Sequence, residues 1–130
     1  MDYSKLSDFE INKRVAICIH PDIKNWNCYD VSGRACFVIN EGTPKRVQYG
    51  FSFTSDPSDA WPIISANRIS VEYDAEHQCD IPVEWVTAYG IDELKVHVVS
   101  HQPCEKALRS AMIVFLMMQE SANVQDNPSR

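Results

Sequence analysis

The chain has few of the residues that build nucleotide-binding loops. It contains only four glycines among 130 residues, and it has no G-x-G-x-x-G, Walker-type lysine loop, G-x-S-x-G or H-E-x-x-H sequence. Loops that cradle phosphate need glycine where the backbone approaches the ligand. We therefore expect no nucleotide-dependent enzyme and no cofactor.

Signals for disulfides, secretion and membrane insertion are also missing. The five cysteines are odd in number and form no C-x-x-C pair, as is typical of reduced thiols in a cytosol. The first residues lack the basic and apolar regions of a secretory signal. The longest apolar run, 111–118, is far shorter than the ~18 residues that span a bilayer. We expect a cytoplasmic protein with no membrane partner.

Positive charge is nearly absent from the middle of the chain. Residues 51–94 hold nine acidic side chains and one basic side chain, Arg68, within a chain of net charge −6. Nucleic-acid affinity comes largely from Lys and Arg, so we expect no direct nucleic-acid binding. A solvated acidic face is the simplest interpretation, and a docking surface for a basic protein is the functional one. The candidate partner-binding acids are Asp74, Glu76, Asp80 and Glu84.

The length and composition fit one globular domain. The chain has 130 residues, of which 45% are hydrophobic and 23% charged. We predict a single α+β domain over residues 1–122, with an antiparallel sheet of about four to six strands packed with two to three helices. Residues 123–130 are predicted to form a flexible polar tail.

Three segments carry helix signals. Ser7 and Glu10 have the spacing of a capping box, in which Glu10 can also reach back to the Ser7 amide. Asp56 precedes a proline and predicts a second helix start. Pro62 either kinks that helix or follows a short 3₁₀ turn. The third helix is predicted from about residue 103 to 121.

Alternating apolar and polar residues predict the strands. A hairpin turns at Gly33, and a meander follows the second helix. The tryptophans Trp26, Trp61 and Trp85 are expected to share the core. The predicted strands are 24–31, 35–39, 47–53, 69–74, 83–89 and 94–98.

The last helix is apolar nearly all round for two turns, so it must be covered on more than one side. Either the sheet and another helix enclose it, or the face formed by Arg109, Ile113 and Met117 meets another protein. The second alternative leaves both a monomer and a homodimer open.

Imidazole and thiol groups raise the question of a metal or a nucleophile. His97, His101 and Cys104 lie close in sequence, and Cys104 near a helix start could have an activated thiol. Their spacing is not that of paired zinc ligand sets, and the acidic loop 74–80 lacks the glycine and bidentate glutamate of a calcium loop. We therefore predict no metal site.

Three stretches together resemble a known family. They are Asp2–Ala16 (DYSKLSDFEINKRVA), Asp59–Ile64 (DAWPII) and Arg109–Glu120 (RSAMIVFLMMQE). They are similar to the small NinX-like proteins of lambdoid phages and enterobacterial prophages, a domain of unknown function. The resemblance implies phage origin, a cytoplasmic location in the bacterial host and a genomic setting beside recombination and lysis-timing accessories. It supplies no catalytic residue.

These observations favour a non-enzymatic accessory protein that binds an unidentified host or phage protein. One alternative is a small metal- or thiol-dependent enzyme that uses His97, His101 and Cys104. Another is an acidic mimic of nucleic acid that inhibits a DNA-processing protein.

Overall fold

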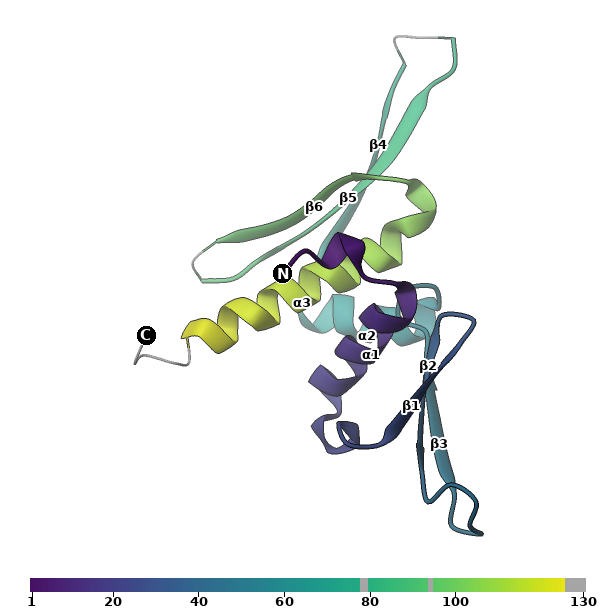
Figure 1. Ribbon diagram of the computed structural model, residues 1–130. Coiled ribbons are helices and arrows are strands. Elements are labelled where there is room, and N and C mark those ends of the chain that lie inside the picture. The colour runs from purple at the N-terminus through teal and green to yellow at the C-terminus, as the bar shows by residue number, and fades with distance from the viewer. Residues whose placement is uncertain (78–79, 94, 126–130) are drawn as a thin grey trace.

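The fold has two small sheets, and its longest helix packs on one of them. The computed structural model describes residues 1–77, 80–93 and 95–125. Its six strands form two three-stranded antiparallel sheets, β1-β2-β3 and β4-β5-β6. Helix α3 (Ala107–Gln125) contacts the second sheet and also helices α1 and α2 (Figure 1). The predicted α+β class is confirmed, and the strands divide between two sheets.

Helix α1 (Asp8–Ile19) begins where the capping box predicts. Ser7 Oγ accepts a hydrogen bond from the Glu10 amide at 3.1 Å. The Glu10 carboxylate accepts from the Ser7 hydroxyl at 3.2 Å, rather than from the Ser7 amide as predicted. The helix ends before Pro21, whose ring cannot continue the hydrogen-bond ladder.

The first sheet consists of β1 (Asn27–Val31), β2 (Arg34–Ile39) and β3 (Val47–Phe51). The tight turn between β1 and β2 places Gly33 at φ +88°, a conformation that favours glycine. Phe37 on β2 is fully buried and belongs to the same core as α1. The predicted hairpin is therefore confirmed.

Helix α2 (Pro57–Ala66) links the two sheets in sequence. Asp56 caps it by accepting from the Ser58 amide at 2.9 Å. The helix already begins at Pro57, so the alternative of a 3₁₀ turn before Pro62 is wrong. Trp61 is 65% exposed on this helix, and the prediction that it shares the core is also wrong.

The second sheet consists of β4 (Ser70–Glu76), β5 (Val83–Ile91) and β6 (Val96–Gln102). Its inner face packs on α3 so closely that a Cβ at Gly90 would lie 2.6 Å from Met118 Sδ. Only glycine allows this approach without displacing the helix or the methionine. Away from α3, the β4–β5 hairpin projects from the body of the molecule (Figure 1).

Helix α3 follows a 3₁₀ turn, η3 (Cys104–Lys106), and is buried along residues 110–116. The second sheet lies on one side of it, and α1 and α2 contact it as well. The chain therefore encloses the helix, the first of the two alternatives. Residues 123–125 extend the helix beyond the predicted start of the tail, and 126–130 lie outside the described residues. None of the described helices is long and apolar enough to cross a bilayer.

Candidate interaction surface

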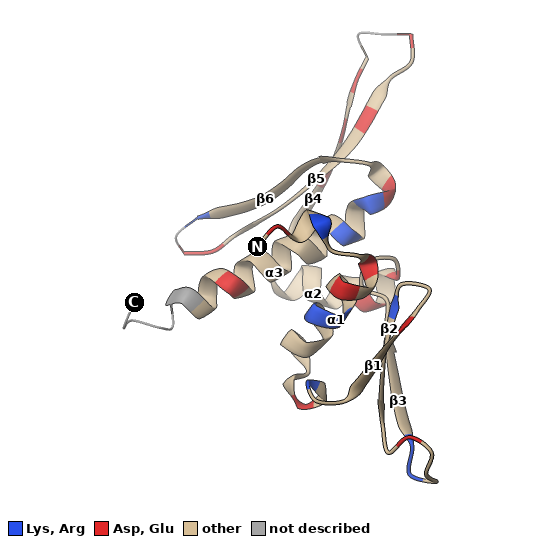
Figure 2. Cartoon of the chain, viewed as in Figure 1, with Lys and Arg blue, Asp and Glu red and all other residues tan. Residues whose placement is uncertain are grey.

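The projecting β4–β5 hairpin carries the acidic candidates. Asp74 and Glu76 lie in β4, Glu84 lies in β5, and Asp80 is exposed between the strands. Residues 74–76 are thus strand rather than loop. Figure 2 shows acidic residues along this hairpin and no basic residue on it. The four side chains therefore share one acidic projection, the acidic hairpin (residues 70–77 and 80–91).

The register of β4 against β5 sorts the acids between two faces. Asp74 lies opposite Trp85 and Glu76 opposite Val83, whereas Glu84 lies opposite Ala75. Directly paired residues of an antiparallel sheet share a face, and neighbours along a strand alternate. Asp74 and Glu76 are therefore on one face and Glu84 is on the other, so negative charge surrounds the projection.

Large apolar side chains are exposed on the same hairpin. Tyr73 is 66% exposed, Ile81 is 79% exposed and Val83 is 59% exposed. Tyr73 is on the inner face, as its alternation predicts, but its side chain is exposed although its partner Val86 is buried. Packing within the chain therefore does not account for these side chains, and exposed aromatic and aliphatic groups are common at protein-binding surfaces.

A shallow depression of about 390 Å³ lies at the base of the hairpin. Carboxylates beside an aromatic ring favour a cationic side chain, through both charge and the negative face of the ring. The side chain of Cys104 reaches this depression from η3. Its lining residues are Tyr73, Asp74, Ala75, His77, Glu84 and Cys104.

The histidine and cysteine candidates occupy separate environments. His97 is 4% exposed, and its Nε2 lies 2.6 Å from Asp92 Oδ2. His101 is exposed and stacks on Trp85 with ring centroids 5.1 Å apart. Among residues 1–77, 80–93 and 95–125, no three His, Cys, Asp or Glu side chains are grouped so that they could hold a metal ion. The structure does not assemble His97, His101 and Cys104 into a ligand set.

Cys18 and Cys28 also give no support for a reactive thiol. Burial raises the pKa of the Cys18 and Cys28 thiols, which disfavours the thiolate that nucleophilic attack requires. Cys79 lies outside the described residues.

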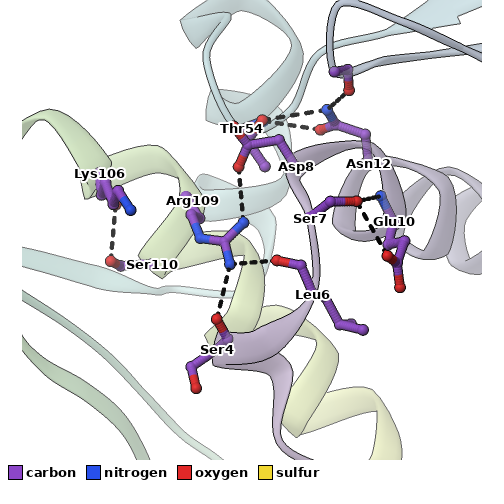
Figure 3. Close-up of polar contacts among 11 residues, drawn as sticks. Ser4, Leu6, Ser7, Asp8, Glu10, Asn12, Thr54, Lys106, Arg109 and Ser110 are labelled. Atoms are coloured by element: carbon purple, nitrogen blue, oxygen red, sulfur yellow. Dashed lines mark hydrogen bonds and ion pairs between the residues drawn. The ribbon is translucent and has the colours of Figure 1, made fainter.

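The N-terminal segment contacts the face of α3 with Arg109, Ile113 and Met117 through hydrogen bonds of Arg109. Arg109 Nη2 donates to the Leu6 carbonyl at 2.6 Å, and Nη1 lies 2.8 Å from Asp8 Oδ1 (Figure 3). Ile113 is 6% exposed and Met117 is half-buried. Arg109 therefore has partners within the chain, and the predicted role of this face in partner binding stays a prediction.

Sequence reasoning missed Asn12, a polar residue on the buried side of α1. Its side chain is 1% exposed and donates to the Gly33 carbonyl at 2.9 Å and to Thr54 Oγ1 at 3.2 Å. Its Oδ1 accepts from the Thr54 amide at 3.0 Å (Figure 3). The position of Asn12 between Ile11 and Val15, next to an apolar stripe, was the available signal.

Comparison with known proteins gives one match. A family model described as Bacteriophage P22, NinX matches residues 2–119. No curated protein and no solved structure matches the chain.

Proposed function

We propose that this chain, which belongs to the bacteriophage P22 NinX family, is a phage-derived accessory protein that binds a basic surface of another protein through its acidic hairpin. The family match covers most of the chain and supports phage origin. The partner is a host or phage protein, and binding rather than catalysis is the proposed activity.

The observation that carries this proposal is the projection of an acidic, partly apolar hairpin beyond the core. Asp74, Glu76, Asp80 and Glu84 lie on it, and no Lys or Arg occurs between residues 69 and 94. Unbalanced charge of one sign attracts an oppositely charged partner and speeds its encounter. The exposed Tyr73 adds apolar contact area beside the charge.

We place this activity in the cytoplasm of the bacterial host. The four described cysteines, Cys18, Cys28, Cys36 and Cys104, are free thiols, which supports a reducing compartment.

Paired charge variants test the proposal. One variant carries Asp74→Asn, Glu76→Gln and Asp80→Asn. Its control, which makes the same change in net charge, carries Asp22→Asn, Glu93→Gln and Glu105→Gln at exposed positions. The free energy of unfolding of both variants should lie within about 0.5 kcal/mol of the parent value, because surface substitutions away from packed contacts have small effects on stability.

The immobilised parent chain and both variants are then used to capture proteins from lysate of phage-infected cells. The parent and the control should retain a common protein, and the hairpin variant should lose it. Capture should weaken as salt rises from about 50 mM to about 300 mM, because added ions screen exposed charges. Equal retention by the hairpin variant would refute the proposal.

The nucleic-acid mimic is a second candidate, favoured by the row of carboxylates at alternate positions of β4. If the hairpin occupies a DNA-binding site, duplex DNA added to the captured complex should release the partner. A partner that stays bound in excess DNA would exclude mimicry and leave the docking function.

The enzyme alternative has less support, because His97 is enclosed with Asp92 and is separate from the exposed His101. Elemental analysis of the purified chain tests it directly. One equivalent of bound zinc would favour the enzyme over the binding protein.

A further inference from the structure

We propose that the outer face of the second sheet, opposite α3, docks an amphipathic helix of the partner. The apolar part of that helix would lie over the end of β5 and the start of β6, at residues 89–91 and 96–98, and its Lys or Arg side chains would lie further along, beside the acidic row of β4. This inference rests on the proposed function and specifies what the basic partner must present.

The apolar half of this face is formed by two cross-strand pairs. Tyr89 lies opposite Val98, and Ile91 lies opposite Val96. Ile91 is 65% exposed, Val96 is 53% exposed and Val98 is 45% exposed. Paired residues on neighbouring strands contact each other, so these four side chains form one continuous patch. We refer to these four side chains as the outer patch.

The opposite face of the same sheet is already packed. Val86 and Ala88 are fully buried, and His97 is 4% exposed. These residues alternate with the outer ones along their strands, and α3 lies against this side. The second sheet therefore has one face covered by a helix and one apolar face left to solvent.

The acidic half of the outer face lies on β4. Glu72, Asp74 and Glu76 occupy alternate positions and pair with outward residues of β5. Tyr89 donates to Glu72 Oε1 at 3.0 Å, which joins the acidic row to the outer patch. Lys95 is the only Lys or Arg between residues 69 and 105. The acidic row pairs with residues 83–87 of β5, whereas the outer patch lies at residues 89–91, so the anionic row follows the apolar patch along the face and meets it at Glu72.

This charge pattern decides between occupants. A second copy of the chain would cover the carboxylates without supplying the cations to pair with them, and burying unpaired charge is costly. An anionic membrane surface would be repelled by the same row. A segment with its own Lys or Arg next to an apolar part satisfies both parts of the face.

The dimensions fit a helix lying along the strands. Val83, which pairs with Glu76, and Ile91 are eight positions apart on β5, about 26 Å, which is close to the roughly 27 Å length of an 18-residue helix. Alternate residues of β4 are about 6.7 Å apart, and residues four apart on a helix rise about 6 Å. Lys or Arg at i and i+4 can therefore meet neighbouring carboxylates.

A designed peptide is the probe for this surface. It is an 18-residue helix with leucine at i, i+3, i+4 and i+7 spacing in one half and lysine at i and i+4 spacing in the other half. One control peptide has glutamate in place of lysine, and a second has the leucine and lysine positions scrambled. Titration followed by backbone amide NMR shifts reports both affinity and location.

The Leu/Lys peptide should bind saturably and shift amides of β5 and β6. Ile91→Thr with Val96→Thr should weaken binding at least about tenfold, as expected when two central apolar contacts are lost. The matched control Val31→Thr, at a 53% exposed position of the first sheet, should leave binding unchanged. Threonine keeps the β-branched shape that strands favour, so folding should be preserved.

The inference would be overturned if both control peptides bound as tightly as the Leu/Lys peptide. It would also be overturned if the Leu/Lys peptide did not bind, or if it shifted only amides of other elements. The lysate capture assay separates this failure from that of the proposed function. If Ile91→Thr with Val96→Thr keeps the partner while neutralising Asp74, Glu76 and Asp80 loses it, the acidic hairpin binds without the outer patch. If neither variant loses the partner, both proposals are wrong.

Discussion

Individual polar residues join parts of the chain that are far apart in sequence. Asn12 connects α1 to the β1–β2 turn and to the segment after β3 through three hydrogen bonds. Within the described residues, no buried side-chain polar atom lacks a hydrogen-bond partner. A single buried amide of this kind contributes mainly because its partners would lose their hydrogen bonds without it.

Replacing Asn12 by alanine should therefore destabilise the fold by about 2–4 kcal/mol, since the Gly33 carbonyl and the Thr54 amide would lose their partner. Chemical denaturation measures the loss. Asn25→Ala, at an exposed position, should change stability by less than about 0.5 kcal/mol. A loss for Asn12→Ala as small as that of the control would show that water replaces the amide.

Tyr3 predicts a pH dependence at the alkaline end. Desolvation, together with its hydrogen bond to Glu120, raises the pKa of Tyr3 to about 12. An unfolded tyrosine ionises near pH 10, so between pH 10 and 12 the folded chain keeps a proton that the unfolded chain loses. The stability that this proton provides is complete below pH 10 and falls as the pH rises toward 12.

Tyr3→Phe should remove this component, together with about 1 kcal/mol from the lost hydrogen bond at neutral pH. Urea unfolding of both chains at several pH values measures the difference. The stability gap between them should narrow from pH 10 to 12, and a constant gap would contradict the assignment.

At the scale of elements, the local signals predicted the starts of α1 and α2 and the hairpin at Gly33. Capping residues and tight turns depend on neighbours in sequence, so they can be identified without the fold. The exposure of Trp61 and Tyr73 could not be predicted in this way. It depends on which side of α2 and which part of β4 other elements cover, and that is a property of packing between distant segments.

The candidate site follows the same division. The acidic composition of residues 74–84 was readable directly, but their projection from the core was not. The outer patch was also missed, because the alternation of 94–98 predicts Val96 and Val98 on the covered face and His97 on the solvent face. That prediction is wrong, since the structure buries His97 and exposes both valines. The separation of His97 from His101 depends on strand register, which one sequence specifies poorly here.

The N-terminal segment is held on α3 by Arg109, and this contact can be tested. Arg109→Lys removes the planar fork that bonds Asp8 and the Leu6 carbonyl together. The substitution should lower the free energy of unfolding by about 1–2 kcal/mol. It should also speed amide hydrogen exchange in η1 (Tyr3–Lys5) and in the residue that follows it. Lys106→Met, which removes a nearby charge, should do neither. Unchanged exchange in Arg109→Lys would assign the anchoring to apolar packing alone.

For the whole molecule, the asymmetry of the second sheet predicts the assembly state. Two outer patches facing each other would bring carboxylate rows into a shared interface without enough cations. Sedimentation at physiological salt should therefore give a monomer. A dimer that Ile91→Thr with Val96→Thr dissociates would instead assign the outer patch to self-association.

The central position of α3 determines the order in which parts of the chain can pack together during synthesis. Both sheets are complete in sequence before α3 is, yet α3 lies between the second sheet and α1 and α2. The hydrogen bond from Tyr3 to Glu120 spans 117 positions and cannot form until that helix is made. A nascent chain that has emerged only as far as β6 therefore holds two three-stranded sheets without the helix that joins the second sheet to α1 and α2. Its final cooperative folding must await the last helix leaving the ribosome.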